Sequence, residues 1–286
     1  MSKPRPDPIE PNQFAVIFEP RDPAGHKGSF GSAAILGGAS GMVGATVLAA
    51  RSALKSGCGR VYVALAQETS SFSLDIHQPE LMWRSLPSLI EMAAQVSAWG
   101  VGCGLGNSTF GLQCLKTAFN HRTGRPLVVD ADGLNALARG DVSPTWGQGC
   151  VVLTPHPAEA ARLLGTDVNA VQANRTSAAL TLAKRFNAWI VLKGQHSIVC
   201  RPDGHCQTNL TGNVGLATAG SGDVLTGLVT SLLAQGFEPD TAVPAAVWLH
   251  GAAADQLVDQ LGGPIGLTAS ELIDSIRRLR NTFKPM

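Results

Sequence analysis

Short runs of consecutive apolar residues alternate with longer amphipathic segments along the chain. Because each run is apolar throughout, it is typical of a strand buried on both faces of a sheet. The amphipathic segments repeat their apolar residues every three or four positions, which predicts helices. The predicted strands are residues 32–36, 60–65, 96–101, 127–129, 151–153 and 190–192, and the predicted helices are residues 45–56, 112–119, 157–164, 175–186, 224–234, 242–258 and 269–280.

The order of these elements predicts an α/β fold built on one main sheet. A strand, the glycine-rich loop at 37–44, a helix and strand 60–65 form a β–α–β unit, whose two strands are expected to be parallel. Repetition of this unit predicts a mainly parallel sheet with helices on both faces. Residues 197–207 differ, because two short runs meet at Pro202-Asp203-Gly204, a turn signal that predicts a small antiparallel edge.

The length of 286 residues favours one domain with a short arm in front of it. Residues 1–20 hold several prolines and two basic residues but no apolar run of the kind found in signal peptides. Residues 1–20 therefore predict an extended arm, and residues 21–286 are expected to form a single domain. The expected location is the cytoplasm. The uncharged stretch 28–50 is not read as a membrane helix, because six glycines interrupt it.

Charge is balanced and sparse. The chain has 22 Lys and Arg residues against 21 Asp and Glu residues, a net charge of +1 that argues against a nucleic-acid partner. Charged residues make up only 15%, below the roughly 25% of an average soluble protein, so much of the chain is expected to be buried or packed against other subunits. Six cysteines without a CxxC pair predict buried thiols in a reducing compartment and no disulfide.

The strongest chemical signal is the glycine-rich stretch at 211–225, whose one charged residue is Asp223 at the start of a periodic helix. N–H groups at a helix N-terminus favour a phosphate or a developing oxyanion. A carboxylate there can take a proton from a substrate hydroxyl while the N–H groups hold a phosphoryl group. Capping by Ser221 or Asp223 is the simpler alternative. The candidate donors are the N–H groups of Gly220, Ser221, Gly222 and Asp223.

Polar or glycine-rich turns follow other predicted strands, at the edge where open α/β sheets bind ligands. His156 follows strand 151–153, with Glu159 on the next helical turn, and Lys193 ends strand 190–192 beside a glycine. Each has a structural alternative: a packed histidine, a carboxylate that complements the helix dipole, and a solvated lysine. Further turns of this kind hold Asp130 and Asp132, and the glycines at 102, 104 and 106.

Motifs of other protein classes are absent from the sequence. There is no GxxxxGK[ST] or HExxH pattern, and the glycines at 37, 38, 41 and 44 do not form the GxGxxG of a Rossmann dehydrogenase. The group of His196, Cys200, His205 and Cys206 lacks the CxxC spacing of a zinc site, which favours a hairpin core.

Together the motifs resemble those of the ADP- or ATP-dependent NAD(P)H-hydrate dehydratase family, a branch of the ribokinase-like superfamily. The resemblance implies a ribokinase-like three-layer sandwich and repair of nicotinamide cofactors hydrated at the ring, with a nucleotide driving the loss of water. The matching segments are GGASGMVGA (37–45), GCGLG (102–106), DADGLNAL (130–137), TPHPAEAARLLG (154–165), LKGQHS (192–197) and TGNVGLATAGSGDVLTG (211–227). Cys103 stands where many members have Pro.

The resemblance also implies roles for single residues. Asp223 is expected to be the catalytic base, and Glu159 falls where kinases of the superfamily carry an acid that organises Mg²⁺. The expected hydrate site comprises Ala45, Gly104, His156 and Asp223. The expected nucleotide site comprises Lys193, Gly194, Gln195, His196, Ser197 and Gly222, to which the helix N-terminus adds Gly220 and Ser221.

Cofactors and partners follow from the same resemblance. We expect Mg²⁺, ADP or ATP as co-substrate with ADP preferred, NADH hydrate and NADPH hydrate as substrates, AMP as a product, and a homotetramer. Only about twenty residues precede the predicted domain at 21–286, so the epimerase domain of many relatives is expected to be a separate protein acting on the same pool, unless epimerisation is spontaneous.

Two other functions remain open from the sequence. One is a small-molecule kinase of the same fold, for hydroxymethylpyrimidine, thiazole or pyridoxal. The other is a non-catalytic nucleotide sensor, against which the presence of Asp223 and Lys193 argues.

Overall fold

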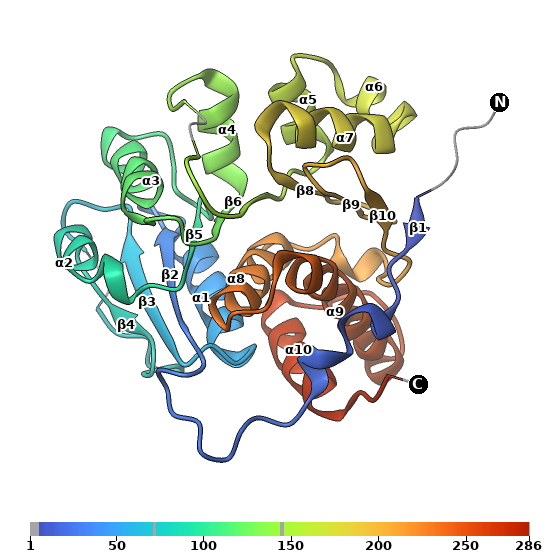
Figure 1. Ribbon diagram of the computed structural model, residues 1–286, viewed down its shortest axis with the longest axis horizontal. Helices are drawn as coiled ribbons and strands as arrows, with labels where there is room; N and C mark the ends of the chain where they lie inside the picture. The colour runs from blue at the N-terminus through green and yellow to red at the C-terminus, as the bar shows by residue number, and fades with distance from the viewer. Residues whose placement is uncertain (1–5, 71–72, 144–145, 286) are drawn as a thin grey trace.

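The computed structural model describes residues 6–70, 73–143 and 146–285, which form a ten-stranded mixed sheet. Its strands are β1 (Asp7–Pro8), β2 (Ser32–Gly37), β3 (Arg60–Leu65), β4 (Met82–Trp83), β5 (Ala98–Val101), β6 (Leu127–Val129), β7 (Val151–Leu153), β8 (Trp189–Leu192), β9 (Ile198–Cys200) and β10 (Cys206–Thr208). The order is β1-β10-β9-β8-β7-β6-β5-β2-β3-β4. In the part of the sheet ordered β8-β7-β6-β5-β2-β3-β4, all neighbouring strands are parallel. Strand β9 is antiparallel to both of its neighbours, β8 and β10 (Figure 1). The mainly parallel sheet with a small antiparallel edge is therefore confirmed.

Helices cover both faces of the sheet, as predicted. One face packs against α1 (Val43–Lys55), α8 (Ser221–Ala234), α9 (Pro239–Leu261) and α10 (Ala269–Thr282) (Figure 1). The other packs against α2 (Leu86–Glu91), α3 (Thr109–His121), α4 (Ala131–Arg139), α5 (Pro157–Leu164) and α7 (Arg175–Phe186), with α6 (Val168–Ala173) beside α5. Three short 3₁₀ helices are η1 (Pro11–Phe18), η2 (Ala93–Gln95) and η3 (Val214–Leu216).

The uninterrupted apolar strands are explained by these two cores. In β2, Ala33 and Ile35 point into the core beneath α1 and α8, while Ala34 and Leu36 point into the core on the opposite face. Successive side chains of a strand alternate between faces, so a strand covered on both sides needs an apolar residue at every position.

Helix α8 is held tightly against α1. A Cβ atom on Gly227 would lie 2.0 Å from the carbonyl oxygen of Ala49, so the two backbones meet where only glycine fits. The Ser52 hydroxyl donates to the Val224 carbonyl at 2.7 Å, and the Ser231 hydroxyl donates to the Ala53 carbonyl at 2.7 Å. This close packing fixes the position of the N-terminus of α8.

The predicted extended arm is wrong over Pro11–Phe18, which form η1. Proline fits the first helical position, and Phe14 and Ile17 bury their side chains on one side of η1. The Phe14 ring lies 5.8 Å from that of Trp248 in α9. Residues 1–5 of the predicted arm lie outside the described residues. One domain over residues 21–286 remains our proposal.

The prediction that the chain has no disulfide is wrong at the antiparallel edge, where Cys200 and Cys206 are bonded. The turn of the hairpin places these residues directly opposite each other on β9 and β10, with their Cα atoms 4.1 Å apart. Spacing rules for CxxC motifs do not detect such a cross-strand pair. Cys58, Cys103 and Cys114 are buried free thiols, as predicted, while Cys150 is half-buried.

We expect Cys206→Ser to lower the free energy of unfolding by about 2 kcal/mol, because the crosslink closes a short loop and restricts the unfolded chain. Urea denaturation without reductant measures the difference. With excess reductant the variant and the unaltered protein should unfold at the same urea concentration. Equal midpoints without reductant would contradict the expected contribution of the bond.

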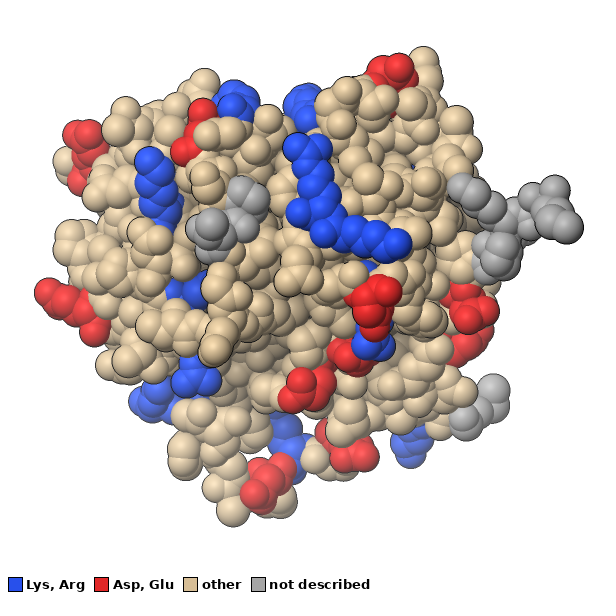
Figure 2. All heavy atoms as spheres, turned by 45° about the horizontal axis from the view of Figure 1, so that its top comes forward, with Lys and Arg blue, Asp and Glu red and all other residues tan. Residues whose placement is uncertain are grey.

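Surface features agree with the sequence analysis. Among the helices of the described residues, none has the length and apolarity needed to cross a membrane. On the face shown in Figure 2, uncharged residues cover most of the surface, and basic and acidic groups are interspersed.

Candidate active site

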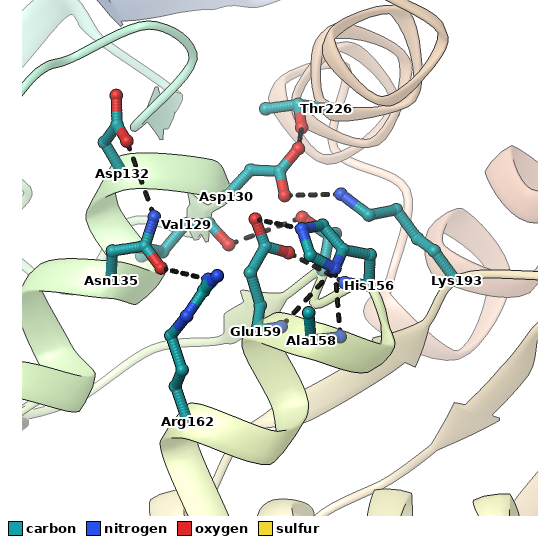
Figure 3. A network of polar contacts seen from close by, with 11 residues as sticks. Val129, Asp130, Asp132, Asn135, His156, Ala158, Glu159, Arg162, Lys193 and Thr226 are labelled. Atoms are coloured by element: carbon teal, nitrogen blue, oxygen red, sulfur yellow. Dashed lines mark hydrogen bonds and ion pairs between the residues drawn. The ribbon is translucent and has the colours of Figure 1, made fainter. Parts of the chain in front are cut away.

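The carboxyl ends of neighbouring parallel strands bring the predicted site residues to one edge of the sheet. Asp130 follows β6, His156 lies just beyond β7, and Lys193 follows β8, although they are far apart in sequence. The N-terminus of α8 faces this edge from the other side (Figure 3). The predicted gathering of strand-end side chains at one site is therefore what the structure shows.

Asp223 lies in the first turn of α8, whose N-terminus has no side-chain cap. The hydroxyl of Ser221 donates to the Leu216 carbonyl at 2.8 Å instead of capping the helix. Burial raises the pKa of Asp223 to about 6; a hydrogen bond with the Cys103 thiol opposes this rise, and the charge of Asp130 adds to it. A carboxylate whose pKa lies this close to neutrality suits general base catalysis.

A buried ion pair lies beside this turn. The Lys193 ammonium is 2.7 Å from Asp130 Oδ1, and the Thr226 hydroxyl donates to Asp130 Oδ2 at 2.8 Å (Figure 3). Burial alone would lower the pKa of Lys193, but the carboxylates of Asp130 and Glu159 outweigh it and raise the pKa above its ordinary value. Lys193 is thus a fixed cation rather than a solvated surface lysine.

A cavity of about 490 Å³ opens next to Lys193 and Gly222. This volume is typical of small-molecule and cofactor sites. Val214, Leu216, Leu225 and Val247 give it an apolar wall suited to a flat ring. The predicted nucleotide residues that line it are Lys193, Gly194, Gln195, His196, Ser197, Ser221 and Gly222, whereas Gly220 does not line it.

Gly220 instead shapes the turn before α8. Its φ of +91° lies in the left-handed region, and a Cβ atom there would lie 2.4 Å from Leu48 Cδ1 in α1. The left-handed φ favours glycine at this position, whereas the end of the Leu48 side chain could move aside. Because the first N–H groups of a helix have no acceptor within it, those of Gly222 and Asp223 are available to a ligand.

Two of the predicted hydrate residues, Ala45 and Gly104, lie against each other. A Cβ atom on Gly104 would lie 3.2 Å from the Cβ of Ala45, so these two residues are in contact. The thiol of Cys103, next to Gly104, opposes the rise in the pKa of Asp223 and therefore lies near that carboxylate. Asp223 also directly follows Gly222, which lines the cavity beside Lys193.

His156 and Glu159 form a reciprocal cap at the start of α5. Nδ1 of His156 accepts from the Glu159 N–H, and Glu159 Oε2 accepts from the His156 N–H at 2.7 Å. Burial and the charges of Lys193 and Arg162 lower the pKa of His156, so its ring is neutral with the proton on Nε2. The predicted dipole role of Glu159 is present, while the half-exposed ring of His156 remains accessible to a ligand.

The sequence analysis missed two side chains at this site. His250 in α9 lines the cavity, and its Nε2 lies 2.8 Å from the Ser221 carbonyl. Burial lowers the pKa of His250 to about 4, so it is neutral. Its position in an apolar helix gave no signal. Thr226, likewise inside a periodic helix, was read only as part of a matching motif.

A sequence model of the family described as NAD(P)H-hydrate dehydratase matches residues 33–278. The chain belongs to this family. An ADP-dependent (S)-NAD(P)H-hydrate dehydratase from Neisseria meningitidis is 45% identical over 94% of this chain and 91% of its own length. A bifunctional NAD(P)H-hydrate repair enzyme from Moorella thermoacetica is 39% identical over 89% of this chain, which spans 50% of that protein.

Solved structures of NAD(P)H-hydrate dehydratases agree with the fold. The ADP/ATP-dependent enzyme from Bacillus subtilis, co-crystallised with ATP and Mg²⁺, superimposes with a TM-score of 0.82 at 30% identity over 96% of this chain and 97% of its own. Ribokinase-like proteins are among the structural neighbours. The predicted ribokinase-like fold is therefore confirmed, and the family match favours a dehydratase over a vitamin-precursor kinase.

Proposed function

We propose that this protein is an ADP-dependent dehydratase that returns (S)-NAD(P)H hydrate to NAD(P)H. The observation that carries the proposal is the position of Asp223. This half-buried carboxylate, with its pKa raised to about 6, directly follows Gly222, which lines a cavity with a fixed cation, and it lies near Cys103, the neighbour of Gly104. The named relatives support the same reaction.

The first step transfers a phosphoryl group. Asp223 takes the proton of the ring hydroxyl, and the hydroxyl oxygen attacks the terminal phosphorus of ADP while the bond to the bridging oxygen breaks and AMP leaves. The Lys193 ammonium and the N–H groups of Gly222 and Asp223 stabilise the charge on the transferring group. Hydroxide, a poor leaving group, thereby becomes a phosphate ester.

The second step eliminates phosphate. The ring nitrogen supplies an electron pair as the carbon–oxygen bond breaks, and phosphate departs with both electrons of that bond. Loss of a proton from the adjoining ring carbon then restores the double bond of the reduced nicotinamide. The net reaction converts the hydrate and ADP into NAD(P)H, AMP and phosphate.

Magnesium has no preformed cage in the described part of the chain, which contains no group of three or more His, Cys, Asp or Glu residues suited to a metal. Both carboxylate oxygens of Glu159 contact His156, at 2.7 and 3.3 Å, so Glu159 takes part in the cap at the start of α5. Mg²⁺ commonly binds through substrate phosphates and keeps several waters. We propose that it enters with the nucleotide, and no step above depends on Glu159 as its ligand.

The proposal is tested by incubating the purified protein with (S)-NADH hydrate, Mg²⁺ and either ADP or ATP. Recovery of the absorbance of reduced nicotinamide reports dehydration. We expect recovery that requires a nucleotide and is faster with ADP. Failure with both nucleotides would reject the dehydratase, and phosphorylation of a vitamin precursor would then establish a kinase.

Activity should fall as the solution is acidified. Because Asp223 acts as a carboxylate and its pKa is about 6, we expect kcat/KM to drop about tenfold per pH unit well below 6 and to level off about one pH unit above it. The pH profile of hydrate turnover at saturating ADP measures this. Activity that rises on acidification would mean that Asp223 acts in its protonated form.

Three further proposals concern the cellular setting. The protein works in the cytoplasm, where nicotinamide cofactors and ADP are at hand, and an epimerase activity interconverts the two hydrate epimers of the same pool. The low fraction of charged residues supports a homotetramer. Light scattering of the purified protein measures its mass and tests the last of these.

A further inference from the structure

Asp130 occupies the N-cap position of α4, yet its carboxylate does not cap that helix. An aspartate there normally accepts hydrogen bonds from the first helical N–H groups. In this chain the next residue, Ala131, has a φ of +47°, in the left-handed region that side chains rarely adopt. The side chain of Asp130 turns away from α4 toward Lys193 and Thr226 (Figure 3). The usual structural reason for an aspartate at this position is therefore absent.

The surroundings of Asp130 show where its charge acts. The residue is 1% exposed, and its two oxygens are used by Lys193 Nζ at 2.7 Å and Thr226 Oγ1 at 2.8 Å. A Cβ atom on Gly222 would lie 3.3 Å from Lys193 Nζ and 3.8 Å from Asp130 Oδ2. The ammonium group is thus held beside Gly222, at the N-terminus of α8 and on the wall of the cavity.

Asp130 is poorly placed to be the base itself. Its buried oxygens are already engaged by an ammonium and a hydroxyl group, so neither faces a substrate hydroxyl. Lys193, by contrast, has further N–H donors on its ammonium group beyond the one directed at Asp130. A lysine that uses one N–H group to bind a carboxylate, and keeps its other N–H groups for a ligand, is suited to hold an anion at a defined place.

We propose that Asp130 is a positioning residue that holds the Lys193 ammonium beside Gly222, where it contacts the terminal phosphoryl group of a nucleoside diphosphate. This rests on the proposed function, in which that group lies at the N-terminus of α8. Without Asp130 the flexible lysine side chain would lose its fixed direction. The nucleotide would then lose the contact with its terminal phosphate but keep its other contacts in the cavity.

The test compares ADP with AMP, which lacks the terminal phosphate. Calorimetric titration of Asp130→Asn should give a Kd for ADP raised about tenfold, the loss of one charge-assisted contact, and a Kd for AMP changed less than threefold. In a Lys193→Met background the same substitution should cause no further change, because Asp130 acts through Lys193.

Asp132→Asn is the matched control. It makes the same chemical change two residues away, where the carboxylate accepts from the Gly106 N–H at 2.8 Å and no hydrogen bond to Lys193 is present among the described residues. Both Kd values should stay within threefold of those of the unaltered protein. Circular dichroism confirms the fold of each variant before titration.

If Asp130→Asn weakened the binding of ADP and AMP equally, the proposal would be overturned, because the Asp130–Lys193 ion pair would then have only a structural role. Unchanged binding of both nucleotides would also overturn it. If Asp130→Asn does not fold, Asp130→Glu takes its place, because it keeps the charge but shifts the position of the carboxylate. The same selective loss of ADP binding is expected. Unchanged selectivity between ADP and AMP would overturn the proposal. Binding requires no turnover, so a failure of the dehydratase assay with a selective loss of ADP would reject the proposed function alone.

Discussion

Asp223→Asn is expected to lower kcat for the hydrate by about a thousandfold while ADP still binds. The substitution keeps the size and polarity of the side chain and removes only its ability to take a proton. The cavity that receives the nucleotide is lined by other residues, so its affinity for ADP should change little. Turnover measured at pH 8 with saturating ADP, together with calorimetric titration of ADP, separates the two effects. Loss of both turnover and ADP binding would contradict the role of Asp223 as the base.

The free energy of unfolding of Asp223→Asn shows whether the substitution leaves the fold intact. The folded pKa of Asp223, about 6, lies above the value near 3.9 of an unfolded aspartate, so the native state binds the extra proton and loses stability as the pH rises from about 4 to 6. The asparagine side chain does not ionise. At pH 8 the variant should therefore unfold with a free energy about 2 kcal/mol higher, and at pH 4 it should match the unaltered protein. A variant that is less stable at pH 8 would show that the ionised carboxylate stabilises the fold.

Gly227→Ala is expected to lower the free energy of unfolding by about 3 kcal/mol. Its added methyl group would lie 2.0 Å from the Ala49 carbonyl oxygen, so α1 and α8 must separate. The atom in the way belongs to the backbone of a buried helix and cannot rotate aside. Because α8 carries Asp223 at its N-terminus, the separation should also reduce turnover. Urea denaturation and the hydrate assay measure the two consequences.

Gly44→Ala is the matched control for this prediction. It makes the same substitution in α1, where a Cβ atom would have no neighbour within 4 Å. Alanine favours a helix by up to about 1 kcal/mol over glycine, so this variant should be as stable as the unaltered protein or more so. Similar destabilisation by both substitutions would mean that the contact between α1 and α8 is not the cause.

The sequence predicts the fold well where a pattern is long or strongly bounded. The helix at 157–164 is found at its observed bounds because Pro157 starts it and a left-handed Gly165 ends it. Helix α4 is missed, since it follows β6 after one residue and reads as a turn with two carboxylates. β1 and β4, with two residues each, are too short to show a pattern, and their pairing depends on distant strands.

Some residues of the candidate site can be predicted from the sequence, and others cannot. Asp223 and Lys193 are visible in the sequence because a glycine-rich turn or a strand end surrounds them. The partnership of Lys193 with Asp130, 63 residues earlier, is not visible, because it arises only when β6 and β8 are placed in one sheet. His250 gives no signal either, since it looks like one more position of a buried helix. Contacts between distant elements are therefore what the structure adds.

The central claim is that the oxygen of the ring hydroxyl group leaves as part of the phosphate. Isotope labelling tests this claim most directly. (S)-NADH hydrate that carries ¹⁸O in its ring hydroxyl is converted by the protein with unlabelled ADP, and the inorganic phosphate is recovered for mass spectrometry. Phosphoryl transfer to the hydroxyl predicts that each phosphate released contains one ¹⁸O atom. Unlabelled phosphate, with the ¹⁸O found in water, would contradict the account, because the hydroxyl would then have left without being phosphorylated.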